Sequence, residues 1–401
     1  MPERNLDFDS FVNRRGTDSL KFDHATRRGK PEGLLSYWVA DMDFKTSSYV
    51  QDAIRETAEH GIYGYTEPKE RYFAAVVGWM KTRFDFEPRE ESLVVTPGVV
   101  FALAQCVRAF TAPGDSVLIQ QPVYYPFSEV VLDNNRRLVS SDLVLGDDGR
   151  YQIDFDDFER KIVDFNVKLF LLCSPHNPGG RVWTRAELER LGSICLAHGV
   201  FVVSDEIHND VVFSGKHTVF ETISPEFAAR CATCTSASKT FNVAGLQVAN
   251  IFVSDRKSRL AFKREIAASG YSQPNAVGLA ATRAAYEHGE EWRAAALRYL
   301  GQNLDFAVDY VNREIPYART TRNEGTYLLW INLRETGWSD DELERVVVDD
   351  AKLWLDGGRM FGPAGRGFQR MNFACPRSYL AQGLERLREA IINASVLKKT
   401  F

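Results

Sequence analysis

The chain reads Ala232-Thr-Cys-Thr-Ser236-Ala-Ser238-Lys239-Thr-Phe-Asn242-Val-Ala-Gly245-Leu246 where a predicted strand, residues 232–236, runs into a turn of small residues. A lysine placed directly after a buried strand is expected to be poorly solvated. Such a lysine can have a lowered pKa and attack a carbonyl as the neutral amine, which Schiff-base formation requires. Taken alone, a surface lysine is the better interpretation of Lys239. The rest of the chain reverses that preference.

Predicted strands and helices alternate around this stretch, from about residue 90 to residue 255. Short β-branched or aromatic runs separated by amphipathic stretches are typical of parallel strands joined by crossover helices, so we predict α/β architecture. One predicted helix, 184–198, opens with a capping box made by Thr184 and Glu187. The other predicted elements here are a helix over 99–110 and strands over 92–96, 116–120, 168–174, 200–205 and 247–254.

The pattern changes beyond Tyr271, where the chain turns helical over 274–315. Strand patterns follow at 326–333 and 369–373, and a final helix is predicted over 378–396. This composition favours a separate α+β domain. We therefore predict a large α/β domain over residues 50–290 and a small domain built from residues 1–49 and 291–401, joined through a long helix because no flexible linker is visible.

Composition and charge exclude several functional classes. The 401 residues are 44% hydrophobic and 26% charged, the balance of an ordinary globular protein with a sizeable core. The net charge of −5, without a basic face, argues against a nucleic-acid partner. No long apolar stretch and no leader pattern occurs, so we expect a cytoplasmic protein without membrane contact.

The cysteines do not indicate a disulfide framework. The chain has 6 cysteines scattered along it, and we expect them to be reduced. Cys231 and Cys234 form an isolated C-x-x-C without a second pair or a nearby histidine. Burial in a strand is therefore a better interpretation than zinc or redox chemistry, and no metal site is predicted.

Polar side chains follow two further predicted strands at their carboxyl ends. The strand 168–174 runs into Pro175-His-Asn177-Pro-Gly-Gly, and the strand 200–205 ends in Asp205-Glu-Ile-His208. Ligands bind at this edge of an open α/β sheet. A carboxylate there needs a cationic partner, which a protonated pyridine nitrogen would supply. Asn177 would then donate to a ring hydroxyl, although Asn-Pro-Gly-Gly by itself is simply a turn.

Two more segments are candidate anion sites. Thr96-Pro-Gly98-Val-Val100 is a predicted strand-to-helix turn, where glycine lets an anion approach the backbone N–H groups of the helix N-terminus. Many α/β proteins have such turns. Arg370 has the planar fork that matches a substrate carboxylate. Arg377 is a second candidate, for which a surface or capping role is preferred.

Four elements occur in order: Asn177-Pro-Gly, Asp205, Ser236-x-Ser-Lys239 and Arg370-x-Asn372. Together they resemble the fold-type I pyridoxal 5′-phosphate (PLP) enzymes of the class I/II aminotransferase superfamily, over nearly the whole chain. The resemblance implies a mostly parallel seven-stranded sheet in the large domain and PLP as cofactor. It places Lys239 at cofactor carbon C4′, Asp205 at the pyridine nitrogen and Asn177 at the ring oxygen. The remaining implied cofactor contacts are Gly98, Val99, Val100, His208, Ser236 and Ser238.

The same resemblance covers two tyrosines and the substrate contacts. Tyr124 resembles the aromatic residue that stacks on the pyridine ring, although by itself it is better interpreted as a core residue. Tyr65 resembles the tyrosine that reaches the phosphate from the neighbouring subunit, which implies a homodimer. The implied substrate-binding residues are Ala40, Tyr124, Asn177 and Arg370.

Three segments narrow the resemblance: Trp38-Val-Ala-Asp41-Met-Asp43-Phe44, Asp205-Glu-Ile-His208 and Asn372-Phe-Ala-Cys-Pro-Arg-Ser378. They resemble the MalY/PatB-type cystathionine β-lyases, also called C–S lyases. His208 stands where many aminotransferases have tyrosine, and Gln247 where many have a phosphate-binding arginine.

We therefore expect a lyase that cleaves cystathionine or cysteine S-conjugates to pyruvate, ammonia and a thiol, with Lys239 as the base that removes the Cα proton. Two alternatives stay open. One is an aminotransferase on the same scaffold. The other is a lyase with a second role in binding a transcription regulator.

Overall fold

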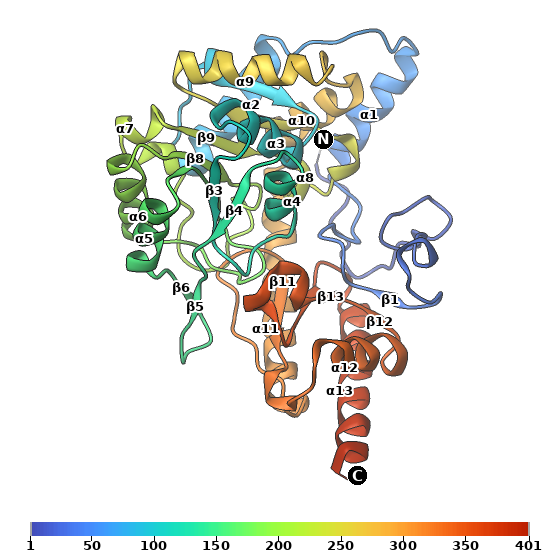
Figure 1. The fold of residues 1–401 in the computed structure, drawn as a ribbon. Coiled ribbons are helices and arrows are strands. Elements are labelled where there is room, and N and C mark those ends of the chain that lie inside the picture. The colour runs from blue at the N-terminus through green and yellow to red at the C-terminus, as the bar shows by residue number, and fades with distance from the viewer. Residues whose placement is uncertain (1, 400–401) are drawn as a thin grey trace.

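The central element of the fold is a seven-stranded sheet with strand order β2-β10-β9-β8-β7-β3-β4. It is seen in a computed structural model that describes residues 2–399 (Figure 1). Its strands are β2 (Leu93–Thr96), β3 (Ser116–Ile119), β4 (Arg137–Ser140), β7 (Val167–Cys173), β8 (Phe201–Asp205), β9 (Cys231–Thr235) and β10 (Ala249–Phe252). Strand β10 runs antiparallel to both its neighbours, and the pairs from β9 to β4 are parallel. The predicted α/β architecture with a mostly parallel sheet is confirmed.

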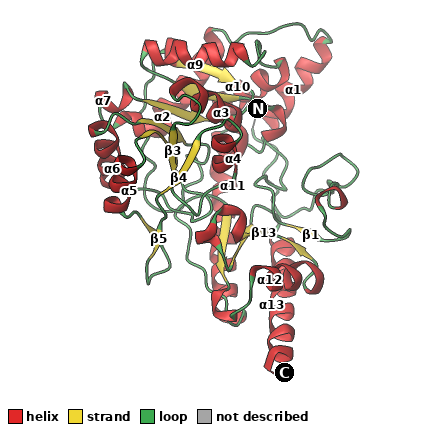
Figure 2. Ribbon diagram, in the orientation of Figure 1, coloured by secondary structure: helices red, strands yellow, loops and turns green. Residues whose placement is uncertain are grey.

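Helices cover both faces of this sheet (Figure 2). The alternation of side chains along a strand explains the arrangement. On β7, Leu169 and Leu171 pack in one apolar cluster with α3 (Val99–Phe110), α4 (Pro126–Leu132) and α9 (Arg256–Ala268). Phe170 and Leu172 pack in another with α5 (Phe155–Asp164) and α6 (Arg185–Ala197). The predicted capping box of Thr184 and Glu187 is present at the start of α6.

A smaller body contains the C-terminal part of the chain (Figure 1). Its antiparallel sheet has the order β11-β14-β13, formed by β11 (Leu328–Asn332), β14 (Phe368–Asn372) and β13 (Asp356–Gly357). Helices α11 (Glu290–Glu314), α12 (Asp340–Arg345) and α13 (Arg377–Lys399) belong to the same part of the chain. The N-terminal segment joins it, because β1 (Leu35–Ser36) pairs in parallel with β12 (Leu353–Trp354). The domain boundaries after residues 49 and 290 stay a prediction.

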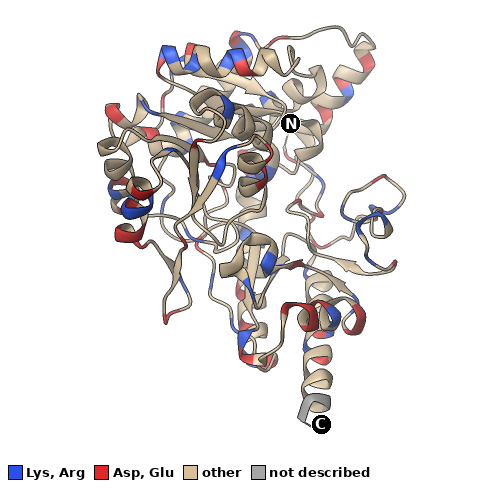
Figure 3. Ribbon diagram, in the orientation of Figure 1, with Lys and Arg blue, Asp and Glu red and all other residues tan. Residues whose placement is uncertain are grey.

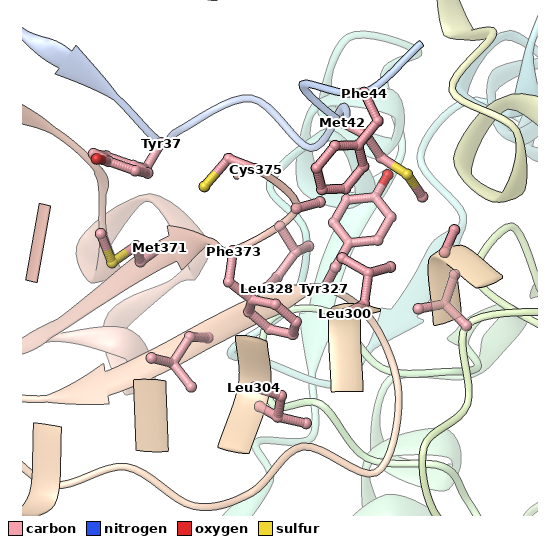
Figure 4. Packing of buried hydrophobic residues seen from close by; sticks show 14 of the residues in the cluster. Tyr37, Met42, Phe44, Leu300, Leu304, Tyr327, Leu328, Met371, Phe373 and Cys375 are labelled. Atoms are coloured by element: carbon pink, nitrogen blue, oxygen red, sulfur yellow. The ribbon is translucent and has the colours of Figure 1, made fainter. Parts of the chain in front are cut away.

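The N-terminal segment is also anchored in the core of this body. Met42 and Phe44 are 2% and 5% exposed, and they pack in one apolar cluster with Leu300 of α11 and with Tyr327. Figure 4 shows these side chains around the Tyr327 ring. The segment that connects the two parts of the molecule is therefore held in place by apolar packing at two of its residues.

Two expectations differ from the structure. The single helix predicted over 274–315 is two helices, α10 (Ala276–His288) and α11, which are separated at Gly289. A Cβ atom on Gly289 would lie 2.3 Å from Cε1 of Phe241, so this position tolerates glycine alone. Strand β4 is absent from the predicted strands because only Leu138 and Val139 are apolar in this short strand at the sheet edge.

Four α-helices and one hairpin complete the set of α-helices and strands among the described residues. They are α1 (Ser48–His60), α2 (Glu70–Phe84), the short helices α7 (Pro225–Ala228) and α8 (Ala237–Thr240), and the hairpin of β5 (Val144–Leu145) with β6 (Tyr151–Gln152). Both basic and acidic residues occur on the outer helices (Figure 3). Within residues 2–399, no helix combines the length and the apolar character needed to cross a membrane.

Candidate active site

A cavity of about 310 Å³ opens where β7 and β8 end and where α3 begins. It is lined by residues that are far apart in the sequence. Ten of them were candidates from the sequence, namely Ala40, Gly98, Val99, Val100, Tyr124, Asn177, Asp205, His208, Ser238 and Lys239. The others are Pro97, Phe101, Cys173, Ile207, Ala244 and Gln247. The carboxyl edge of the sheet therefore brings together most of the predicted site.

Lys239 stands on the short helix α8, directly after β9. Its Nζ donates a hydrogen bond of 2.7 Å to the carbonyl oxygen of Ala40. Burial lowers the pKa of Lys239 to about 8, although the carboxylates of Asp41 and Asp205 act in the opposite direction. An appreciable fraction of this amine is therefore neutral near physiological pH, as a nucleophile or a base must be.

Asp205 is the last residue of β8, and its side chain is buried. Burial raises the pKa of this carboxyl to about 7. Its Oδ1 accepts a hydrogen bond of 3.1 Å from the backbone N–H of Ile207, and Asp205 forms no ion pair within the described part of the chain. A buried carboxylate of this kind is suited to bind a cationic group that enters the cavity.

Arg370 lies on β14 and is 2% exposed. Its Nη1 donates to Oδ1 of Asn177 at 3.1 Å, and its Nη2 donates to the Trp38 carbonyl oxygen at 2.7 Å. Nη2 also pairs with the buried carboxylate of Asp356. Arg370 does not line the cavity but lies behind Asn177, and its Nε has no hydrogen-bond partner among the described residues.

The start of α3 forms another part of the cavity lining. The first N–H groups of a helix have no acceptor within the helix, so they face whatever occupies this space. Gly98 precedes the helix with a φ of 118°, a conformation that favours glycine. The cavity lining also includes Ser238 and Gln247, neither of which carries a charge.

Besides Arg370, two further sequence candidates lie outside this cavity. Ser236 caps α8: its Oγ accepts from the Ser238 N–H, and it donates to the Val248 carbonyl oxygen at 2.6 Å. Tyr65 lies between α1 and α2, is 96% exposed, and lines a separate surface hollow with Tyr271. Neither residue contacts the cavity within one copy of the chain.

His208 lines the cavity but carries no charge there. It is 4% exposed, and burial holds the pKa of its ring well below the usual range. Its Nδ1 has no partner among the described residues. The ring lies edge-on to Tyr327, with the ring centroids 5.8 Å apart.

Tyr327 and Asp356 were missed from the sequence. The hydroxyl of Tyr327 donates to the Ala40 carbonyl oxygen at 3.1 Å, so it shares this acceptor with Lys239. Tyr327 falls in a predicted strand, where an aromatic residue is ordinary. Asp356 pairs with Arg370 across two neighbouring strands, and no local sequence signal marks that pairing.

The cavity fits a pyridoxal phosphate group. An amine with a lowered pKa faces it from Lys239, and a buried carboxylate without a bonded cation faces it from Asp205. The N-terminus of α3, which also lines the cavity, is available for an anion. Tyr124 is a further lining residue, and its backbone N–H is tied to the Asn177 carbonyl oxygen at 3.0 Å.

Comparisons with known proteins agree with this fit. Residues 41–387 match the family described as aminotransferase class I and II. Cystathionine β-lyase PatB of Bacillus subtilis is 41% identical over 387 residues, which are 96% of this chain and 100% of that protein. The structure of a PLP-bound putative aminotransferase from Clostridium difficile 630 matches with a TM-score of 0.94 and 41% identity over 96% of this chain and 100% of that chain. The structure of a PLP-bound C–S lyase from Staphylococcus hominis matches with a TM-score of 0.91 and 34% identity. This match covers 97% of the present chain and 99% of the lyase chain.

Proposed function

We propose that this chain, which belongs to the aminotransferase class I and II family, is a PLP-dependent carbon–sulfur β-lyase. It cleaves cystathionine or cysteine S-conjugates to pyruvate, ammonia and a thiol. The observation that carries the proposal is that the Lys239 amine and the buried Asp205 carboxylate line the same cavity. The similarity to PatB of Bacillus subtilis supports the lyase over the other activities of the family.

The chain's own residues account for cofactor binding. Asp205 would hold the protonated pyridine nitrogen and Asn177 the ring oxygen, while Tyr124 would stack on the ring. The N–H groups at the start of α3 and the Ser238 hydroxyl would bind the phosphate. When bound, PLP supplies an aldehyde carbon for the Lys239 amine and a ring that accepts electrons.

Substrate binding and proton transfer follow from the same geometry. Arg370 and Asn177, joined by their hydrogen bond, would bind the substrate carboxylate together with the backbone of Ala40. Lys239 Nζ would take the proton from the substrate Cα atom. The lowered pKa of Lys239 keeps part of the amine neutral, so that it can accept this proton.

A pyruvate assay tests the proposal. We expect the purified, PLP-loaded protein to be yellow and to form pyruvate from L-cystathionine and from several S-substituted cysteines. Absence of pyruvate with every one of these thioethers would contradict the lyase proposal.

Dimer formation is part of the proposal. The segment that carries Tyr65 exposes three large apolar side chains, since Ile62, Tyr63 and Tyr65 are 73%, 63% and 96% exposed. Such a segment favours an interface. In a homodimer, Tyr65 would reach the phosphate in the site of the neighbouring subunit.

Mixed dimers test this arrangement. Tyr65→Ala and Lys239→Ala each damage every site of their own homodimer. A mixed dimer contains one site with an intact Lys239 from one subunit and an intact Tyr65 from the other. We expect mixing to yield a population of sites that releases PLP more slowly than the Tyr65→Ala homodimer. No slowly releasing population after subunit exchange would contradict a shared site.

A cytoplasmic location is also proposed. All 6 cysteines are free and buried in the structure. Secreted proteins commonly use cysteine pairs as disulfides, whereas thiols stay reduced in the cytosol. The pattern of free cysteines therefore supports a reducing compartment.

A further inference from the structure

The segment from Trp38 to Phe44 contributes Ala40 to the lining of the active site, and most of its backbone carbonyl oxygens accept a side-chain hydrogen bond. Lys239 and Tyr327 donate to the carbonyl oxygen of Ala40. The side-chain amide of Asn372 donates to the carbonyl oxygens on either side, those of Val39 and Asp41, each at 2.6 Å. Asn242 accepts from the Met42 N–H at 2.9 Å and donates to the Met42 and Phe44 carbonyl oxygens. The position of Asp41 relative to the Lys239 amine is therefore fixed by the backbone on both sides.

Four charged side chains meet beside this segment, and we name them the N-terminal charge cluster: Arg14, Lys21, Asp41 and Asp43. Arg14 donates to Asp41 at 2.6 Å and to Asp43 at 2.8 Å. Lys21 Nζ lies 2.7 Å from Asp43 and 3.5 Å from Asp41. Lys21 is 1% exposed, so a cation is held here away from water. Two positive and two negative side chains balance, which is what burial of charge requires.

Asp41 joins this cluster to the active site. Asp41 follows Ala40, the acceptor of the Lys239 hydrogen bond, in the chain. Burial lowers the pKa of Lys239, and the Asp41 carboxylate is the charge that raises this pKa the most. The pKa of Asp41 itself is lowered, because its bonds to Arg14 and Lys21 outweigh burial, so Asp41 stays ionised. The other charges that act on the amine are Asp205, which also favours the ammonium form, and Arg370, which opposes it.

We propose that Asp41 is a positioning residue for the reaction, whose carboxylate, fixed by Arg14 and Lys21, stabilises the proton that Lys239 takes up. This inference rests on the proposed function and extends it to a residue outside the cavity lining. Lys239 must be neutral to accept a proton and must then hold that proton as an ammonium ion. An anion beside the amine makes it a stronger base. The cations of the cluster limit this effect, because they prevent Asp41 from binding the ammonium ion too strongly.

The N-terminal charge cluster therefore sets the balance between the neutral amine and the ammonium form of Lys239. Removing Asp41 and removing Arg14 should act in opposite directions. Asp41→Asn takes away the anion, so the ammonium form becomes less stable. Arg14→Gln leaves the Asp41 charge less compensated, so the ammonium form becomes more stable. A merely structural role would not produce opposite signs.

The test measures the rate at which cofactor-free protein takes up PLP, followed by the appearance of colour, as a function of pH. Only the neutral amine attacks the aldehyde, so the rate of the wild-type protein should rise through a midpoint near pH 8. We expect Asp41→Asn to lower this midpoint by roughly one unit and Arg14→Gln to raise it. Asp41→Glu, which keeps the charge, should restore a midpoint close to that of the wild type. Asp52→Asn removes an exposed carboxylate and serves as the control.

The outcomes separate this inference from the proposed function. If wild-type protein takes up PLP and both the Asp41→Asn and Arg14→Gln midpoints equal that of the wild type, the role of Asp41 is wrong while the cofactor site stands. If both variants move in the same direction, the role of Asp41 is also wrong. If Asp41→Asn does not fold, Arg14→Gln alone decides. A raised pH midpoint in Arg14→Gln would support the inference, and a lowered or unchanged midpoint would overturn it. No colour with wild-type protein would overturn the proposed function itself.

Discussion

Lys239→Ala is expected to abolish carbon–sulfur cleavage and the yellow colour of the loaded protein. Alanine provides neither the amine for the cofactor aldehyde nor the base for the Cα proton. The rate should fall by roughly a thousandfold or more, the range of a lost general base. The fold should persist, because within residues 2–399 the Lys239 side chain makes one hydrogen bond, to Ala40.

Pyruvate formation and the visible absorption spectrum check this prediction. The matched control is Lys81→Ala, since the Lys81 side chain is 57% exposed and far from the cavity lining. Near-wild-type turnover in a folded Lys239→Ala protein would overturn the assignment of the whole site. An unfolded variant would be recognised from its circular dichroism spectrum.

Asp205→Asn is expected to reduce turnover by about 100-fold or more, the usual effect of removing one fixed electrostatic partner at a reacting centre. Asparagine has nearly the shape of aspartate but lacks the negative charge that keeps the pyridine nitrogen protonated. The visible colour should persist, because Lys239 is intact. Asp133→Asn, which removes an exposed carboxylate, is the control.

The same substitution should stabilise the cofactor-free protein at alkaline pH. Burial raises the pKa of Asp205 to about 7, so the folded state binds more protons than the unfolded state between about pH 4 and pH 7. The contribution of Asp205 to stability therefore decreases as the pH rises. We expect the melting temperature of Asp205→Asn to exceed that of the wild type by more at pH 8 than at pH 4. Equal differences at both pH values would contradict the burial of a charged Asp205 in the empty site.

Much of this site could be predicted because it depends on strand ends. Asn177, Asp205 and Lys239 follow buried apolar runs, and the carboxyl ends of parallel strands must share one edge of the sheet. The turn at Gly98 could be found for a similar reason, since a strand-to-helix turn exposes backbone N–H groups. These local signals do not require knowledge of the tertiary structure.

The rest depends on contacts between distant segments. The hydrogen bond from Arg370 to Asn177 and the pairing of Arg370 with Asp356 arise only when the small sheet is packed against the large one. Tyr327 looks like an ordinary strand residue until its hydroxyl meets the Ala40 carbonyl oxygen. No local sequence pattern marks Lys21 as buried, yet it is 1% exposed and pairs with Asp43.

The lyase claim is tested most directly by the stoichiometry of the products from L-cystathionine. The loaded protein should release keto acid, ammonia and thiol in equal amounts over many turnovers, without an added keto acid as amino acceptor. An aminotransferase would instead form at most one keto acid per site and release neither ammonia nor thiol. Equal amounts of the three products are the result we predict, and keto acid without ammonia and thiol would contradict the assignment of this chain as a carbon–sulfur lyase.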